Sequence, residues 1–177
     1  TAAQLNKAGH TVTVYERDDK IGGLLRYGIP DFKLDKSVID RKIQILEEEG
    51  IKFQVNVNVG VDVTVDYLLQ EYDAVALCGG STIPRDLPAP GRENKGIYFA
   101  MEFLKDNSKR VQGSKILRDE PINVKGANVL VIGGGDTGSD CVGTSNRHGA
   151  KSITQIELLP KPKTERGTDD AWPLWPQ

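Results

Sequence analysis

The segment Ala127–Leu159 constrains the fold more than any other part of the chain. An apolar run over 128–132 is followed by a glycine-rich turn, a stretch of helical composition that ends at Gly149, and a second strand-like run over 152–159. Apolar runs bounded by glycine turns are typical of strands, and the longer stretch between them is typical of a helix. This order predicts a strand, turn, helix and strand unit of the kind that binds dinucleotides.

The turn has the Gly-x-Gly-x-x-Gly spacing of a dinucleotide site, at Gly133, Gly135 and Gly138. Gly133 permits a tight turn, Gly135 has no Cβ to keep a pyrophosphate from the backbone, and Gly138 lets the helix lie close to the strands. The N–H groups at the helix start would then face the diphosphate. Because Glu157 ends the second strand, it is the candidate acid for the ribose hydroxyls. We predict a nucleotide site here rather than a purely structural turn.

Charge and composition argue against several classes of function. The 177 residues include 23 basic and 25 acidic side chains, and the net charge of −2 gives no overall field that attracts nucleic acid or an anionic membrane. No apolar run approaches the roughly 20 residues of a membrane span, and no signal peptide opens the chain. Cys78 and Cys141 lie outside any Cys-x-x-Cys spacing, which indicates a reducing compartment and no metal site. We expect a cytoplasmic protein that binds neither nucleic acid nor a membrane.

The start of the chain repeats part of the central unit. Residues 1–8 have helical composition, Gly9 is in position to cap that helix, and the β-branched run 11–16 ends on Glu16. The same succession of helix, glycine, strand and glutamate ends at Glu157. We therefore expect two copies of one half-unit, the first without its own strand and phosphate-binding turn, because residues 1–8 lack a helix start signal. Glu16 would be the ribose-binding acid of the first copy; the alternative is a surface residue at a strand end.

Two more glycine pairs lie between these half-units. Gly22 and Gly23 suit a backbone that lies against a flat ligand, although a glycine loop without a ligand is the ordinary alternative. Gly79 and Gly80 follow an apolar run typical of a strand buried in a parallel sheet, and ligands bind beyond the carboxyl ends of such strands. The other expected elements are a loop over 21–30, helices over 36–49, 66–70 and 98–105, a half-buried strand over 51–59, a buried strand over 73–78, a polar surface segment over 107–124 and an irregular segment over 160–177.

These patterns predict an α/β fold of two Rossmann-like, three-layer dinucleotide-binding domains, both incomplete in this chain. The proline-rich connection 84–91 is the expected boundary between them. The domains are therefore expected over 1–90 and 91–177.

Three segments resemble a known flavoprotein family, the small (β) subunit of glutamate synthase. They are 22–34, 84–91 and 133–141, of which the first is specific to this group. The same module occurs in the N-terminal half of dihydropyrimidine dehydrogenase and in related ferredoxin-linked reductases. The resemblance implies FAD in the domain over 1–90 and a nicotinamide cofactor in the domain over 91–177. It also implies cysteine-ligated iron–sulfur clusters in a segment of the parent protein that precedes this module and is not expected in this chain.

The resemblance assigns roles to individual residues. The family's FAD-contacting positions, the first of which holds the adenosine ribose, match Glu16, Leu24, Lys33 and Val59. The family's turn for the nicotinamide cofactor matches Gly134, Gly135, Asp136 and Thr137.

The residues after the second strand bear on the choice between NADH and NADPH. Family members that prefer NADPH tend to have two basic residues there, and this chain has Leu158 and Leu159. The preceding Glu157 would accept hydrogen bonds from a free ribose diol and repel a phosphate. We therefore expect NADH. The basic side chains just beyond, which would offer NADPH another phosphate contact, are Lys161, Lys163 and Arg166.

The function implied by the resemblance is that of an NAD(P)H-dependent oxidoreductase subunit. Hydride would pass from the nicotinamide to the flavin, and electrons would leave to iron–sulfur centres for glutamate synthesis from glutamine and 2-oxoglutarate on a large subunit. Such chemistry requires no catalytic side chain, and none is predicted; His10 and His148 each lie beside a helix-capping glycine. Two alternatives stay open. One is a ferredoxin-linked NAD(P) oxidoreductase or pyrimidine reductase module, and the other is a non-catalytic dinucleotide-binding fragment.

Overall fold

The structure is a computed structural model that describes residues 1–116, 118–160, 167–168 and 171. It divides into two compact units, Thr1–Asn123 and Val124–Gln177. Each unit is described by itself below. The expected irregular segment over 160–177 lies almost wholly outside the described residues, as do Lys161, Lys163 and Arg166.

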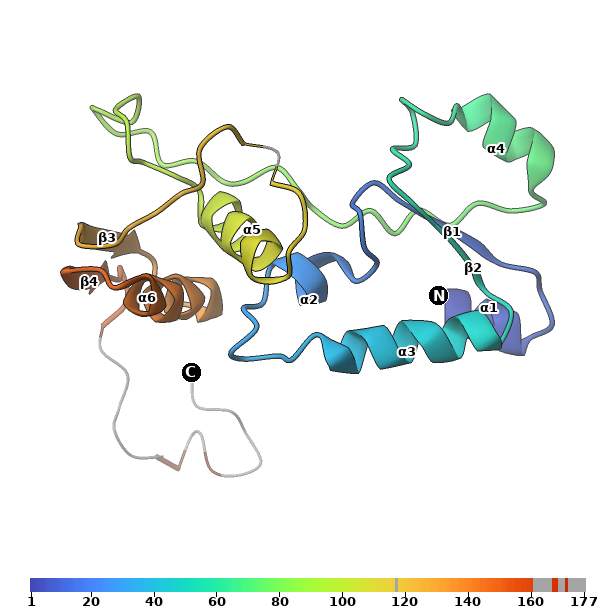
Figure 1. The fold of residues 1–177 in the computed structure, drawn as a ribbon, viewed down its shortest axis with the longest axis horizontal. Coiled ribbons are helices and arrows are strands. Elements are labelled where there is room, and N and C mark those ends of the chain that lie inside the picture. The colour runs from blue at the N-terminus through green and yellow to red at the C-terminus, as the bar shows by residue number, and fades with distance from the viewer. Residues whose placement is uncertain (117, 161–166, 169–170, 172–177) are drawn as a thin grey trace. The chain divides into compact units, whose positions relative to one another are not determined.

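The first unit contains a two-stranded parallel sheet with helices before and between its strands (Figure 1). Its elements are α1 (Ala2–Lys7), β1 (Thr13–Glu16), α2 (Gly23–Tyr27), α3 (Ser37–Glu48), β2 (Lys52–Val55), α4 (Val65–Glu71) and α5 (Ala100–Val111). Thr13 lies opposite Lys52 and Glu16 opposite Val55. The crossover from β1 to β2 therefore runs through α2 and α3, as parallel pairing requires.

Local sequence explains the helix that carries most of this crossover. The Asp35 carboxylate accepts a hydrogen bond of 2.8 Å from the Ser37 N–H just ahead of α3. Ile39 is buried, and Gly50 takes a positive φ of 99° directly after the helix. Asn6 of α1 donates through Nδ2 to the Glu49 carbonyl at 2.8 Å, which joins α1 to the end of α3. The predicted helices over 36–49 and 66–70 are confirmed by α3 and α4.

The second unit consists of β3 (Asn128–Ile132), α6 (Asp136–His148) and β4 (Ser152–Ile156). β3 and β4 pair in parallel, with Asn128 opposite Ser152 and Ile132 opposite Ile156. Gly149 ends α6 in the left-handed conformation, with φ 78° and ψ 42°. The predicted strand, turn, helix and strand are confirmed.

One predicted strand is wrong. Residues 73–78, expected as a buried strand, form no strand, and Leu77 is 91% exposed. A central strand needs hydrogen-bonded neighbours and helices over both faces. Among the described residues β1 and β2 pair only with each other, so the apolar character of this run does not lead to burial.

Two other segments are more ordered than expected. The glycine-rich loop over 21–30 contains the helix α2, and Arg26 and Tyr27 are buried because α2 packs against α5. The polar segment over 107–124 is also not a plain surface segment. Its first residues continue α5 to Val111, and Ser108 and Lys109 in that helix are buried.

The compact units do not coincide with the expected cofactor domains. The structure divides the chain between Asn123 and Val124, so α5 packs within the first unit. A cofactor domain is defined by the ligand it holds rather than by compactness. The boundary between 1–90 and 91–177 therefore stays a prediction.

Candidate functional site

The glycine turn of the second unit lies at the carboxyl end of β3. The Gly133 N–H donates to the Ile156 carbonyl at 2.9 Å, which continues the pairing of β3 and β4 by one residue. Gly133 then turns the chain with a φ of 115°, a conformation that side chains rarely allow. Gln155 holds the turn from the next strand, because its Nε2 donates to the Gly133 carbonyl at 2.7 Å.

The other two motif glycines meet different surroundings. A Cβ on Gly138 would run into the Gly133 carbonyl and would lie 2.8 Å from Gln155 Nε2, so helix and strand are packed too closely for a side chain there. A Cβ on Gly135 would meet nothing within 4 Å, and its backbone is extended. Gly138 thus serves the packing of α6, and Gly135 leaves open space at the start of the helix. This is the arrangement that a pyrophosphate needs to approach the backbone.

Glu157 directly follows β4, and its carboxylate lies against the turn. The Gly134 N–H donates to Oε2, and Oε1 accepts from the backbone N–H groups of Leu158 at 2.6 Å and Leu159 at 3.1 Å. A Cβ on Gly134 would collide with this carboxylate. The hydrogen bonds, first that from Leu159, lower the pKa of Glu157 and keep it ionised. An ionised carboxylate is a hydrogen-bond acceptor only, which suits ribose hydroxyls.

The remaining predicted residues of the turn begin the helix. Asp136 and Thr137 are the first residues of α6, with Gly135 in the N-cap position. The structure therefore brings together all seven residues predicted for the nicotinamide cofactor, on one β–α–β unit.

Glu16 repeats the geometry of Glu157 in the first unit. It is the last residue of β1, and its Oε1 accepts from the Asp18 N–H, two residues on, at 2.9 Å. Glu157 accepts in the same way from Leu159, two residues on. The repeat that the sequence predicts therefore extends to the side chains of the two acids.

Gly22 and Gly23 form the entry into α2, and both have positive φ, 129° and 50°. A Cβ on Gly22 would lie 3.0 Å from the Arg26 Cβ, whereas a Cβ on Gly23 would meet nothing within 4 Å. The side chain of Leu24 is 64% exposed on the same short helix. This stretch therefore combines backbone that only glycine adopts easily with an exposed apolar side chain, which fits a flat ligand.

The remaining predicted FAD residues follow this stretch in the sequence. Lys33 is exposed, and its N–H donates to the Pro30 carbonyl at 3.0 Å. Val59 forms an isolated bridge with Val63 beyond β2. Gly79 and Gly80 are exposed in the segment where no strand forms.

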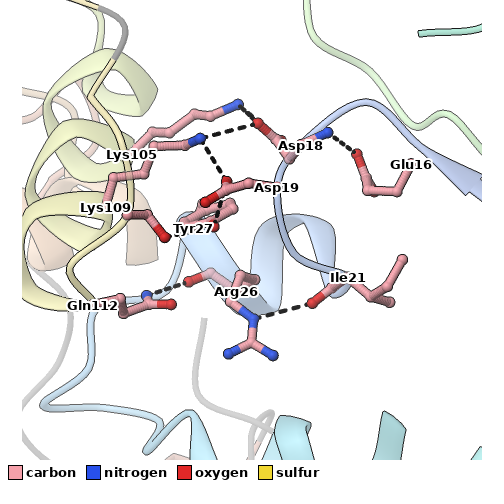
Figure 2. Close-up of polar contacts among 10 residues, drawn as sticks. Glu16, Asp18, Asp19, Ile21, Arg26, Tyr27, Lys105, Lys109 and Gln112 are labelled. Atoms are coloured by element: carbon pink, nitrogen blue, oxygen red, sulfur yellow. Dashed lines mark hydrogen bonds and ion pairs between the residues drawn. The ribbon is translucent and has the colours of Figure 1, made fainter. Parts of the chain in front are cut away.

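A charged cluster next to Glu16 was missed by sequence reasoning (Figure 2). Lys105 and Lys109, one turn apart on α5, reach Asp18 and Asp19 in the β1–α2 loop. Lys105 Nζ lies 2.8 Å from Asp18 Oδ1, and Lys109 Nζ lies 2.8 Å from Asp19 Oδ1 and 3.5 Å from Asp18 Oδ1. The Tyr27 hydroxyl donates to Asp19 Oδ1 at 2.7 Å. The signal in the sequence was a lysine pair at helical spacing, which is usually a solvated face.

Electrostatics within this cluster favour the charged aspartate and the neutral tyrosine. Partial burial alone would raise the pKa of Asp19, but hydrogen bonds from Lys109, Tyr27 and Ser114 outweigh it and hold that pKa well below its usual range. Burial and the neighbouring Asp19 raise the pKa of Tyr27 to about 12. The cluster therefore combines three ion pairs with a phenol hydrogen bond at physiological pH.

Within the described residues, no group of three or more His, Cys, Asp or Glu side chains is arranged to hold a metal ion. No helix of that part of the chain has the length and apolar character needed to cross a bilayer. Cys78 is exposed and Cys141 is buried, and both are free thiols.

Comparison with known proteins gives the family. A model of the pyridine nucleotide-disulphide oxidoreductase family matches residues 1–173. The chain is 56% identical to the glutamate synthase (NADH) of Schizosaccharomyces pombe over 99% of its own length and 8% of that protein. It is 49% identical to the glutamate synthase (NADPH) small chain of Mycobacterium tuberculosis over 99% of its own length and 36% of that protein. The chain thus spans well under half of the length of these relatives.

A solved structure supports the fold. Mycobacterium tuberculosis FprA in complex with NADPH aligns with a TM-score of 0.67 over 87% of this chain and 39% of that chain, at 24% sequence identity. The α/β dinucleotide-binding fold predicted from the sequence is therefore confirmed. With the family model covering nearly all of its length, this chain belongs to the pyridine nucleotide-disulphide oxidoreductase family.

Proposed function

We propose that this chain is the dinucleotide-binding part of an NAD(P)H-dependent flavoprotein oxidoreductase that supplies electrons for glutamate synthesis from glutamine and 2-oxoglutarate. One observation carries the proposal: the open space at Gly135 and the ionised carboxylate of Glu157 lie together at the carboxyl ends of β3 and β4. A dinucleotide needs both features, because its diphosphate approaches the backbone while its ribose is hydrogen-bonded by an acid.

The second unit would hold the nicotinamide cofactor. Its backbone N–H groups at the start of α6 would face the diphosphate, and Glu157 would accept from the ribose diol. Since Glu157 is charged and is followed by Leu158 and Leu159, a 2′-phosphate would meet repulsion from the carboxylate and two apolar residues directly after it. These features support NADH as the preferred donor. The relatives' names include both NADH and NADPH, so the preference rests on the site.

The first unit would hold FAD. Glu16 would accept from the adenosine ribose, and the backbone at Gly22 and Gly23 would lie against the cofactor. FAD held by these residues would supply the chemistry that links two-electron hydride transfer from the nicotinamide to one-electron transfer toward iron–sulfur centres elsewhere in the parent protein. The proposed FAD residues are Glu16, Gly22, Gly23, Leu24, Lys33, Val59, Gly79 and Gly80.

The partner and the compartment follow from the same proposal. The name of the Mycobacterium tuberculosis relative, a small chain, supports a glutamate synthase large subunit as the partner. The two free thiols, Cys78 and Cys141, support a reducing compartment such as the cytoplasm.

Anaerobic reduction of the bound flavin tests the function. The protein, expressed at its full natural length and loaded with FAD, is mixed with NADH or NADPH while the oxidised flavin band is followed in a stopped-flow instrument. We expect the band to bleach, at a lower concentration of NADH than of NADPH. Electron transfer from the reduced protein to 2-oxoglutarate and glutamine through the large subunit then identifies the acceptor. A flavin that neither dinucleotide bleaches would contradict the proposal.

A further inference from the structure

The proposed function assigns no role to the charged cluster between the β1–α2 loop and α5. We propose that Lys109 is a positioning residue for FAD binding, which fixes the ribose-binding carboxylate of Glu16 through Asp18 and Asp19 (Figure 2). The inference rests on the proposed function of the first unit, because it concerns the geometry of the acid that would hold the adenosine ribose.

A hydrogen bond joins the Glu16 carboxylate to the Asp18 backbone. Glu16 Oε1 accepts from the Asp18 N–H at 2.9 Å, so the orientation of the Glu16 carboxylate depends on the Asp18 backbone. The Asp18 side chain is itself held from α5, by Lys105 Nζ at 2.8 Å and by Lys109 Nζ at 3.5 Å. A carboxylate fixed by two ammonium groups limits rotation of the residue that carries it. The N–H that orients Glu16 is therefore fixed indirectly by α5.

Lys109 is buried together with its charged group. This residue is 5% exposed, and its ammonium lies 2.8 Å from Asp19 Oδ1 and 4.8 Å from the centre of the Tyr27 ring. A buried charge with an acidic and an aromatic partner has a defined geometry, and its removal leaves the half-buried Asp19 carboxylate without this ion-pair partner. Lys105 is in a weaker position because its side chain is 32% exposed. Lys109 is therefore the buried ion-pair partner that reaches both Asp18 and Asp19, and Lys105 adds the shorter contact to Asp18.

The helix α5 and the residue after it also hold the carboxyl end of the segment that runs from Glu16 to Tyr27. Gln112, directly after α5, donates through Nε2 to the Arg26 carbonyl at 3.0 Å. The Tyr27 hydroxyl closes the loop with its 2.7 Å bond to Asp19. The segment from Glu16 to Tyr27 is thus fixed at both ends by one helix, and the Gly22–Gly23 backbone lies between the two attachments.

A double-mutant cycle on FAD affinity tests the proposal. The protein at its full natural length is freed of flavin, and FAD is titrated back into the parent, Lys109→Met, Glu16→Gln and the double variant. We expect each single variant to raise the Kd for FAD roughly tenfold, and the double variant to raise it far less than the hundredfold product, because both changes disable the same carboxylate. The Kd for NADH, which binds the other unit, should stay within about twofold in Lys109→Met.

Two further variants make the result decisive. Lys42→Met removes an exposed lysine of α3 and should leave the Kd for FAD unchanged. If Lys109→Met does not fold, Lys105→Gln takes its place in the cycle, with a smaller loss of roughly two- to fourfold and the same non-additivity with Glu16→Gln. An unchanged Kd for FAD in the Lys109 and Lys105 variants, or losses that multiply with that of Glu16→Gln, overturns this inference and leaves the proposed function standing. A parent that binds no FAD, or a Glu16→Gln variant that binds as the parent does, overturns the proposed function and the inference with it.

Discussion

Replacing Gly138 or Gly135 by alanine should separate the effect of this turn on stability from its effect on dinucleotide binding. At Gly138 an added methyl group meets the carbonyl of Gly133, a residue whose N–H is hydrogen-bonded to the Ile156 carbonyl, and lies 2.8 Å from Gln155 Nε2. Overpacking of this kind costs roughly 1–3 kcal/mol, and the gain in helix propensity from glycine to alanine returns up to about 1 kcal/mol. We expect Gly138→Ala to lower the free energy of unfolding by about 1–2 kcal/mol.

At Gly135 the same change meets nothing within 4 Å, and its φ of −74° and ψ of −177° suit any residue. The poorer N-cap propensity of alanine and the reduced entropy of the unfolded chain each amount to about 0.5–1 kcal/mol and oppose each other. Stability should therefore change by less than about 0.5 kcal/mol. Binding should not be spared, because the methyl group occupies the space for the diphosphate, and the Kd for NADH should rise at least roughly tenfold.

Urea unfolding and calorimetric titration with NADH measure the two effects on the same samples. Both variants carry the same change from glycine to alanine, one at the N-cap of α6 and one within its first turn. A Gly138→Ala variant as stable as the parent, or a Gly135→Ala variant that binds NADH as tightly as the parent does, would contradict this prediction.

Three more predictions follow from charge and burial. Glu157→Gln should weaken NADH more than NADPH in equilibrium titrations, because it removes a charge that repels a 2′-phosphate; equal losses would remove the basis for the NADH preference. Because the pKa of Asp19 is held below its ordinary value of 3.8, its contribution to stability is present above that pH and is lost as the pH falls below it. Asp19→Asn should flatten this acidic limb in a series of urea unfolding curves, and an unchanged limb would contradict the assignment. Burial, and after it the neighbouring Asp140, raise the pKa of Cys141 to about 11. Iodoacetamide at pH near 8 should therefore label the exposed Cys78 in the folded protein and Cys141 only in urea, which mass spectrometry would detect. Rapid labelling of Cys141 without denaturant would show that this thiol is not buried.

The second unit could be predicted almost completely from the sequence because its signals are local. An apolar run, glycines at fixed spacing and a capping glycine determine β3, the turn and α6 within one continuous segment. The bond from the Gly134 N–H to the Glu157 carboxylate joins residues 23 positions apart, and the motif alone predicts only that the acid ends the second strand.

The first unit was harder to predict because its decisive contacts are distant in sequence. Lys109 lies 90 residues from Asp19, and nothing around it distinguishes a buried lysine from a solvated one. The strand predicted for the apolar run 73–78 does not form, since composition cannot say whether a neighbouring strand is available for pairing. The short helix α2 is hard to predict because its N-cap and its first residue are both glycine, and its packing against α5 outweighs their low helix propensity.

We propose that two half-units, each ending in a ribose-holding glutamate, bind two different dinucleotides. Equilibrium titration of FAD and of NADH into the protein at full natural length, with Glu16→Gln and Glu157→Gln beside the parent, distinguishes the two sites. We predict a crossed result: Glu16→Gln weakens FAD roughly tenfold and spares NADH, and Glu157→Gln does the reverse. One variant that weakens both dinucleotides equally, or two variants that weaken neither, would contradict the claim.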